Sequence, residues 1–438
     1  MNHIRRRTSI VSVAVIITLS CLISLFYSIR IGYAPDEGNH VYMARHVANH
    51  FRLATTEEWA YTTYRGHPYH LYSPVPYVLH VPTVLLDQHF GFGHGFWGND
   101  RTVRRLGGLV YAALQVIVTW LLGVALFGRT WTAVTFTSAV TMVPQLRYMH
   151  SYVNADSYTI LIASVILMLS VRVIRDCRID LGRSVMFGLA FAAMAHGKYN
   201  GWPVALIAMM TFCLVIIRQW PGLLAAYRQI GIALALPLLL AGPFYLHVFN
   251  LLDNGHILAE EEHVQLIHST FRGVIPPPSP GLSVLLTRLP VELVFSWRSY
   301  WGWFVGYGEL SPELLRSIFI AFVVSICGFI WFGRNAIKGS SDDKVVFWSC
   351  MLGLGVLFII LIADLVEWRI AGQGRIYMAS LPLIIAMMMI GVGRILEGGA
   401  YYLPALNMKM RGHFWGARLF GGIFAAVLFM ANVVMLVK

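Results

Sequence analysis

The stretch Gly32-Tyr-Ala-Pro-Asp-Glu-Gly-Asn-His-Val-Tyr-Met-Ala-Arg-His46 follows almost directly on the apolar run Ile10–Ile29. A run of that length is sufficient to cross a bilayer as a helix. Two carboxylates, Asp36 and Glu37, therefore lie at the mouth of a predicted membrane span. Acidic side chains at a membrane edge are costly to place, so this pair is a candidate functional site.

The same stretch also has a purely structural interpretation. Pro35 suits the first turn of a helix, and Asp36 and Glu37 suit the positive end of a helix dipole. A helix that begins here would lie at the membrane surface with one apolar face, formed by Val41, Ala44, Ala48 and Phe51. Taken alone, the stretch supports a helix start and a functional site about equally.

The composition of the chain decides its class. The 438 residues are 57% hydrophobic and only 12% charged, with a mean hydropathy of +0.65. An ordinary soluble domain does not have this balance, so we predict an all-α polytopic transmembrane helical bundle that forms a single integral membrane domain over 1–438. We expect about 11 spans (10–12), since each needs about 20 apolar residues. They lie near 9–29, 106–127, 130–149, 157–174, 184–197, 201–217, 229–249, 313–333, 345–364, 376–393 and 418–437.

Basic residues predict the orientation. Three arginines, Arg5 to Arg7, precede the first span, which predicts a cytoplasmic N-terminus and an uncleaved first helix. Alternation from there places most short basic loops on the cytoplasmic side of a bacterial cytoplasmic membrane. The net charge of +12 suits contact with anionic membrane lipids. Nucleic acid is not an expected partner, because the charge is scattered along the membrane edges.

Two predicted outer segments are long. The first outer (periplasmic) loop, 30–105, is too apolar to float freely and is expected to hold amphipathic interfacial helices and a hydrophobic segment at 77–86. The second covers 250–311. Both carry outward cations, for which an anionic substrate or a lipid headgroup is one explanation: Arg45, Arg52, Arg65, Arg101, Arg104, Arg105, Arg272, Arg288 and Arg298.

Several common kinds of site lack support. The five cysteines include no C-x-x-C pair, so neither a disulfide nor a thiolate metal site is implied. His256, Glu260 and His263 would share one helix face, but in a polar loop this is weak support for a metal, and no metal site is predicted. No G-x-x-x-x-G-K-[ST] motif occurs. The energy for any transfer reaction must therefore come with the donor substrate.

Four further polar motifs fall at predicted outward ends of spans. They are centred on Asn154 and Asp156, on Lys198, on Glu309 and Ser311, and on Arg369 and Arg375 around a Gly-Gln-Gly turn. Asp156 could simply cap a helix, and Lys198 could simply extend to the membrane surface. Together with Asp36 and Glu37, however, they combine carboxylates with cations suited to phosphate. This combination indicates transfer from a phosphate-activated lipid donor.

The order of these motifs resembles that of a known class of membrane enzyme. The first motif is Pro35-Asp36-Glu37-Gly-Asn-His40, followed by Ser151-Tyr-Val-Asn154-Ala-Asp156 and Lys198-Tyr199. Trp301-Gly-Trp-Phe-Val-Gly-Tyr307, Gly372-Gln-Gly-Arg-Ile-Tyr377 and Leu381-Pro382 come next. The first looks like the first outer loop of GT-C glycosyltransferases, which use polyprenyl-phosphate sugars. The series is similar to a bacterial family of multi-spanning membrane proteins of unknown function. Tyr307 stands where that pattern has Trp, and Ile376 separates Arg375 from Tyr377.

The resemblance implies a role for individual residues. Asp36 or Glu37 would be the catalytic base, with Asp36 preferred. Lys198, Arg375 and Arg369 would bind the donor phosphate. The residues that would line the substrate site are His40, Asn154, Asp156, Tyr199, Trp303, Gln373 and Tyr377. Enzymes of this class usually invert the anomeric centre. Some use a divalent cation such as Mg²⁺ or Mn²⁺, and the sequence leaves that need open.

The expected function is therefore that of an inverting glycosyltransferase. It would move a sugar from a polyprenyl-phosphate-linked donor to a cell-envelope glycan, such as lipopolysaccharide O-antigen, or to a lipid-linked acceptor, with the active site facing the periplasm. A flippase or transporter for lipid-linked glycans is an alternative, although no internal repeat is evident. A ligase or polymerase, which would need several outer-loop arginines, and a purely structural subunit are further alternatives.

Overall fold

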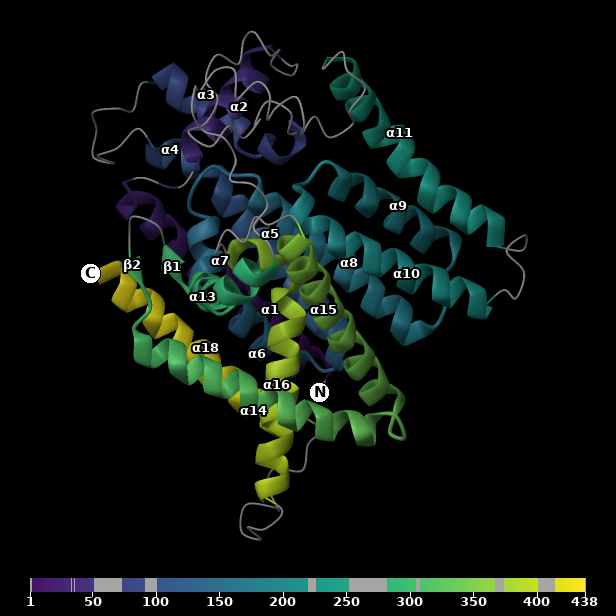
Figure 1. Cartoon of the computed structure of the whole chain (residues 1–438). Coiled ribbons are helices and arrows are strands. Elements are labelled where there is room, and N and C mark those ends of the chain that lie inside the picture. Colours follow the sequence, from purple (N-terminus) through teal and green to yellow (C-terminus); the bar gives the residue numbers. More distant parts are fainter. Residues whose placement is uncertain are drawn as a thin grey trace.

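The computed structural model shows a bundle of helices in which short helices cover one end (Figure 1). It describes residues 2–32, 34, 36–50, 73–90, 101–219, 226–251, 282–304, 308–366, 374–400 and 414–437. The predicted all-α polytopic class is confirmed. In the described ranges the only strands are two two-residue segments, Trp303–Phe304 (β1) and Gly308–Glu309 (β2), which pair antiparallel.

The helices of the first half are α1 (Asn2–Arg30), α2 (Glu37–His50), η2 (Val75–Tyr77), α3 (Val81–Phe90), α4 (Arg101–Arg105), α5 (Gly107–Phe127), α6 (Thr130–Thr141), α7 (Pro144–Met149), α8 (Asp156–Asp176), α9 (Leu181–Ala195), η4 (Tyr199–Gly201) and α10 (Trp202–Gln219). Those of the second half are α11 (Tyr227–Leu251), α13 (Leu282–Trp301), α14 (Pro312–Ala336), α15 (Ser341–Val366), η6 (Gly374–Ser380), α16 (Leu381–Ala400) and α18 (Trp415–Val437).

Within these ranges, nine helices are long and apolar enough to cross a membrane. Nine of the eleven predicted spans correspond to them. The segment 184–197 is the short helix α9, and the prediction of a single span at 130–149 is wrong. Pro144 lacks an N–H group and forces the residue before it away from helical geometry. Val143 is accordingly extended (φ −61°, ψ 120°), so α6 ends before it and α7 begins at Pro144.

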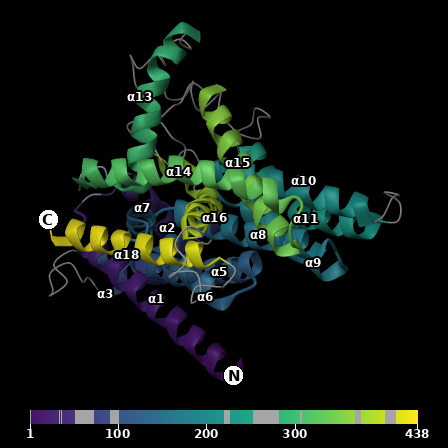
Figure 2. The same ribbon diagram turned by 90° about the horizontal axis from the view of Figure 1, so that it is seen from below.

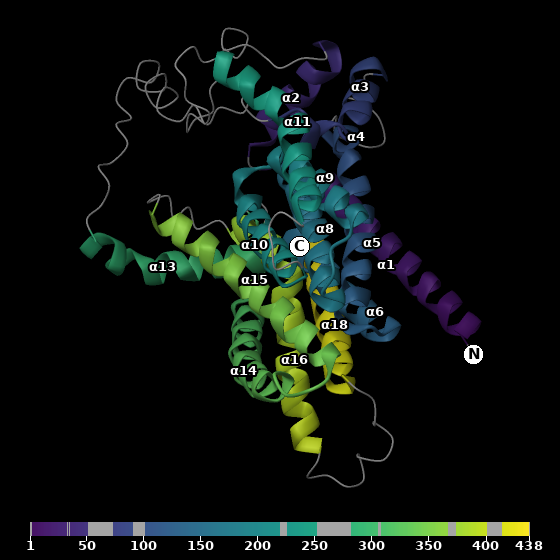
Figure 3. The same cartoon turned by 90° about the vertical axis from the view of Figure 1, so that its right-hand side faces the viewer.

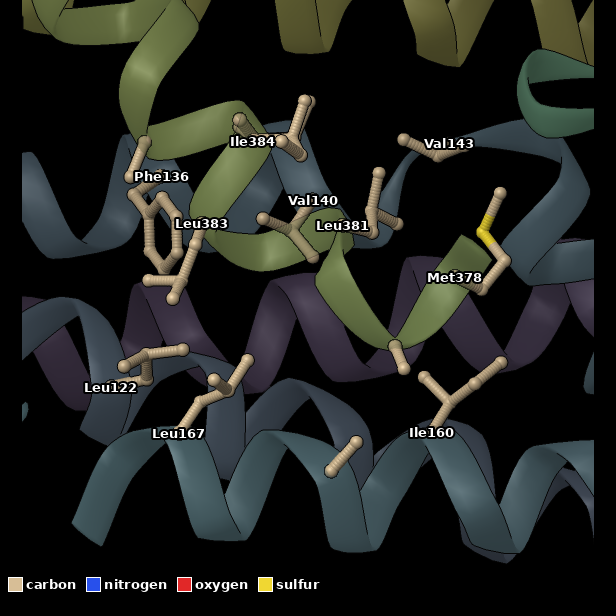
Figure 4. Packing of buried hydrophobic residues seen from close by; sticks show 14 of the residues in the cluster. Leu122, Phe136, Val140, Val143, Ile160, Leu167, Met378, Leu381, Leu383 and Ile384 are labelled. Atoms are coloured by element: carbon tan, nitrogen blue, oxygen red, sulfur yellow. The ribbon is translucent and has the colours of Figure 1, made fainter. Parts of the chain in front are cut away.

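The bundle is organised around α8 and α16. In each, 78% of the most apolar window is buried, compared with 11% for α11 at the periphery. Figure 2 shows α16 end-on between α14, α18 and α15. Leu381 and Leu383 of α16 belong to the same hydrophobic cluster as Leu122 of α5 and Leu167 of α8 (Figure 4). These central helices hold the segments that carry the candidate site.

Helices α14 and α16 cross with their backbones in close approach. A Cβ added to Gly391 would lie 1.9 Å from the carbonyl oxygen of Ser325, and one added to Gly328 would lie 2.0 Å from that of Gly391. Small residues that let two backbones approach in this way are common between membrane helices.

We therefore expect Gly391→Ala to destabilise the protein by about 1–3 kcal/mol, because the new methyl group meets backbone that cannot turn aside. The measurement is thermal unfolding of the purified protein in detergent. Gly422→Ala, in α18, is the matched control, because nothing lies within 4 Å of its added Cβ. Equal melting temperatures for the two variants would show that the crossing is looser than described.

The short helices α2, α3 and α4 form a layer over one end of the bundle (Figures 1 and 3). The predicted apolar face of α2 is confirmed for Val41, Ala44 and Ala48, which are buried, whereas Phe51 lies outside the described residues. Val41 and Ala44 belong to a cluster with Val84 of α3 and with Val153. The layer is thus fixed to the turn between α7 and α8. The extents of the outer segments 30–105 and 250–311 stay predictions.

Candidate active site

Asp36 lies between the end of α1 and the start of α2 with its backbone in the left-handed region, at φ 60°. Its carbonyl oxygen accepts hydrogen bonds from the backbone N–H groups of Asn39 (3.0 Å) and His40 (3.2 Å), which begin α2. Few residues other than glycine adopt this conformation, although Asp and Asn tolerate it best. Such conformations are concentrated at functional sites, where the surrounding structure enforces them.

The next residue, Glu37, forms a buried ion pair with Arg105. Arg105 Nε donates to Glu37 Oε1 at 2.6 Å, and Arg105 Nη2 donates to Glu37 Oε2. Arg105 Nη1 also donates to the carbonyl oxygens of Ser28 (2.7 Å) and Ile31 (2.6 Å) at the end of α1. One guanidinium group therefore joins the end of α1 to the start of α2, on both sides of Asp36. Glu37 is an anchor in this geometry, and Asp36 is the acid that the anchor positions.

Other arginines that the sequence predicted to face outward are also paired with acids of the chain. Arg104 lies 3.0 Å from Asp87, with Arg45 on the same carboxylate at 3.7 Å, and Arg298 pairs with Glu309. With Arg105, these are four of the cations for which an anionic substrate or lipid headgroup was the expected explanation. The structure gives these four a partner within the chain, and an anionic substrate or lipid headgroup as an additional partner stays a prediction. The arginines outside the described residues or without described side chains are Arg52, Arg65, Arg101, Arg272 and Arg288.

The turn before α8 lies directly against Glu37. The backbone N–H of Val153 donates to Glu37 Oε1 at 3.4 Å. Asn154 is fully buried and bonded to local backbone: its Nδ2 donates to the carbonyl oxygens of Met149 (2.6 Å) and Tyr152 (2.9 Å), and its Oδ1 accepts from the N–H of Ser157 (2.8 Å). Asn154 therefore supplies a side-chain acceptor at the start of α8, where Ala155 occupies the N-cap position. The alternative that Asp156 serves as this cap is wrong.

Asp156 instead pairs with Lys198. Their atoms Oδ2 and Nζ are 3.1 Å apart, and the two side chains are 2% and 10% exposed. The backbone N–H of Lys198 donates to Thr159 Oγ1 at 2.9 Å, which holds the turn after α9 against α8. Lys198 therefore does not extend into solvent. The structure brings together two residues, 42 positions apart, that the sequence predicted for one site.

The short helices η4 and η6 bring the motif around Arg375 next to the turn that carries Lys198. The turn η4 follows Lys198 and contacts η6, which in turn contacts α8. The segment carrying Arg375 and Tyr377 is thus adjacent to the one carrying Lys198 and Tyr199, and Tyr377 is buried. Side chains of Tyr199, Trp303 and Arg375 are not described, and Arg369 and Gln373 lie outside the described residues.

His40 connects α2 to the segment before α3. Its Nδ1 lies 2.7 Å from the hydroxyl oxygen of Tyr77, and both side chains are completely buried. Behind it, Ser73 Oγ lies 2.8 Å from Nδ1 of His196, two residues before Lys198. The covering layer is therefore bonded to the same turn that carries the lysine.

The described residues make one continuous arrangement at the end of the bundle covered by α2. It leads from Asp36 and Glu37 through Val153 to Asp156 and Lys198, and then to η6. The Asp36 carboxylate, the largely buried ammonium group of Lys198 and the arginine-bearing segment η6 can together serve a transfer reaction. Sequence reasoning missed Arg105 as the partner of Glu37, because nothing local links residues 68 positions apart.

Comparison with protein-family models finds no match, and comparison with curated proteins finds none either. Among solved structures, the chain is similar to the archaeal oligosaccharyltransferase AglB from Archaeoglobus fulgidus, in complex with an inhibitory peptide and a dolichol-phosphate. The TM-score is 0.50 and the identity 13%, over 97% of this chain and 55% of that one. It is also similar to apo ArnT from Cupriavidus metallidurans, with a TM-score of 0.49 and 14% identity, over 97% and 76% of the two chains. This chain spans about half the length of the oligosaccharyltransferase. The likeness shows that the fold is of the GT-C type.

Proposed function

We propose that this protein is an inverting membrane glycosyltransferase that takes its sugar from a polyprenyl-phosphate donor. One observation carries the proposal: Asp36, in the left-handed conformation, directly precedes Glu37, whose carboxylate contacts the turn that leads to the largely buried Asp156–Lys198 pair. The GT-C-type fold supports it, since the oligosaccharyltransferase with this fold is bound to a dolichol-phosphate.

The reaction would be a single displacement at the anomeric carbon. The acceptor hydroxyl oxygen attacks that carbon while the Asp36 carboxylate takes the hydroxyl proton. The bond between the anomeric carbon and the phosphate oxygen breaks, and the electron pair leaves with the polyprenyl phosphate. Because one base directs one displacement, the product has the inverted configuration.

Charge develops on the departing phosphate, so a fixed cation near it stabilises the transition state more than the ground state. Lys198 is the candidate, because Asp156 and the bond to Thr159 hold it in one place. An ammonium group has three N–H donors, so Asp156 and a phosphate oxygen can share it. Arg375 and Arg369 would add guanidinium donors from the neighbouring segment.

The acceptor we propose is a glycan or lipid-linked saccharide of the cell envelope, reached from the periplasmic side of a bacterial cytoplasmic membrane. The support is the basic residues Arg5 to Arg7 before the first span, which favour a cytoplasmic N-terminus. With that orientation, a crossing by the long helix α1 would put Asp36 on the opposite, periplasmic side of the membrane. The substrate site would be lined by His40, Tyr199, Trp303, Gln373 and Tyr377. Asn154 would support it by holding the start of α8 in place.

We expect Lys198→Gln to lower kcat/KM for the donor about 100-fold, because the phosphate loses its buried cation. The assay incubates purified protein with radiolabelled polyprenyl-phosphate sugars and an extract of envelope glycans, and measures labelled product and released polyprenyl phosphate. Lys344→Gln is the matched control, since Lys344 is exposed at the start of α15. Unchanged turnover in Lys198→Gln would remove this lysine from the mechanism.

Two further experiments use the same labelled donor. Chelation followed by addition of Mg²⁺ or Mn²⁺ tests whether a divalent cation assists departure of the phosphate. Lipid-linked sugar that crosses proteoliposome membranes without cleavage of the sugar–phosphate bond would instead indicate a flippase, and would overturn the proposed transfer reaction.

A further inference from the structure

A group of buried polar side chains lies on α7 and just after it, apart from the residues of the candidate active site. Arg147 is completely buried, and none of its three guanidinium nitrogens has a hydrogen-bond partner. Both ring nitrogens of His150 are also buried without a partner. Folded proteins satisfy nearly all buried polar groups with protein atoms, water or ions. Something other than the polypeptide is therefore expected to contact these donors.

The walls of the cluster are α1, α5 and α7. Ser24 Oγ in α1 donates to the carbonyl oxygen of Arg147 at 3.3 Å, so the two helices are in direct contact. At α5, a Cβ added to Gly108 would lie 2.2 Å from the carbonyl oxygen of His150, so only glycine permits this approach. Ser20 Oγ, one turn before Ser24 on the same face of α1, is another buried group without a partner.

The cluster carries one net positive charge. Burial, together with the charge of Arg147, holds the pKa of His150 well below its usual value. Burial likewise lowers the pKa of His80 to about 4, so both rings are neutral at pH 7. Burial lowers the pKa of Arg147 only to about 10, so the guanidinium group stays charged. Among the described residues, no carboxylate forms an ion pair with it.

We propose that Arg147 and His150 bind one small monovalent anion, such as chloride, enclosed between α1, α5 and α7. The size follows from burial: neither side chain reaches the surface, so an occupant enclosed with them is an ion of a few atoms at most. The charge follows from the single guanidinium group. Water alone would satisfy the donors but would leave a buried charge without a counter-ion, which is strongly destabilising.

The site has a structural consequence for the residues that follow α7. The chain continues from His150 through Ser151, whose carbonyl oxygen accepts a 2.7 Å bond from Ser28 Oγ, into the turn that contains Val153 and Asn154. An anion that holds α7 to α1 and α5 would therefore stabilise the turn against which Glu37 rests. This effect on stability does not depend on any catalytic activity.

The test compares thermal unfolding of the purified protein in sodium chloride and in sodium gluconate at equal ionic strength. We expect Tm to rise by about 2 °C or more, saturably, as chloride replaces the larger gluconate ion. In Arg147→Gln this dependence on chloride should vanish. The matched control Arg178→Gln should keep it, since Arg178 is exposed in the segment that follows the C-terminal end of α8.

Equal Tm values in the two salts, or the same chloride effect in Arg147→Gln, would overturn the proposal and leave water as the occupant. If Arg147→Gln does not fold, the wild-type protein still gives the answer. Crystals grown in sodium bromide should show an anomalous peak at hydrogen-bond distance from the Arg147 guanidinium. A map with no peak there would equally overturn the proposal.

Discussion

Asp36→Asn is expected to lower kcat by about 100- to 10,000-fold, the range usually contributed by a general base. The amide has the shape of the carboxylate but cannot accept the acceptor's proton. Asn also tolerates the left-handed backbone region as well as Asp does, so φ at this position can stay near its present 60°. The loss should therefore appear in turnover and not in Tm, and KM for the donor should change little.

Two further substitutions at the same position separate the effect of the Asp36 carboxylate from the effect of its backbone conformation. Asp36→Gly relaxes the left-handed strain but removes the acid, so it should be as inactive as Asp36→Asn. Asp36→Glu keeps an acid but places a longer side chain in an unfavourable conformation, so it should retain partial activity. If Asp36→Asn turns over normally while Glu37→Gln does not, the assignment of the base to Asp36 is wrong, and Glu37 takes that role.

The sequence predicted the class of fold because that depends on local properties. Long apolar runs mark helices in a membrane whatever their partners are, and the face Val41–Ala44–Ala48 follows from helical periodicity alone. The broken span at 130–149 was also visible in principle, since Pro144 lies inside the run and breaks it. Hydropathy averaged over the whole segment conceals that break.

The pairing of side chains could not be predicted in the same way. The sequence selects Asp156 and Lys198 separately, as polar groups at the ends of apolar runs. That they pair with each other depends on how α9 packs beside α8. Arg105 shows the same limit more clearly. It looks like one of many outward cations, and only the fold places it between Ser28, Ile31 and Glu37.

Arg105→Met should lower the free energy of unfolding by about 3–5 kcal/mol, because it leaves the buried Glu37 carboxylate without its counter-ion. The carbonyl oxygens of Ser28 and Ile31 lose their donors at the same time. Thermal unfolding in detergent measures the change, and Arg316→Met, an exposed arginine in α14, is the control. The free energy of unfolding of Arg105→Lys should lie between those of the wild type and Arg105→Met, since lysine keeps the charge but loses the bidentate geometry.

The double variant Glu37→Gln/Arg105→Met decides whether the two residues act as a pair. Removing both charges should cost less than the sum of the single changes, because neither buried ion is then left alone. Simple additivity would mean that Glu37 and Arg105 do not depend on each other, and that Glu37 is available for chemistry. If Arg105→Met loses stability and Asp36→Asn loses turnover, the two adjacent acids have different roles. Glu37 then holds the start of α2 in place, and Asp36 takes the proton.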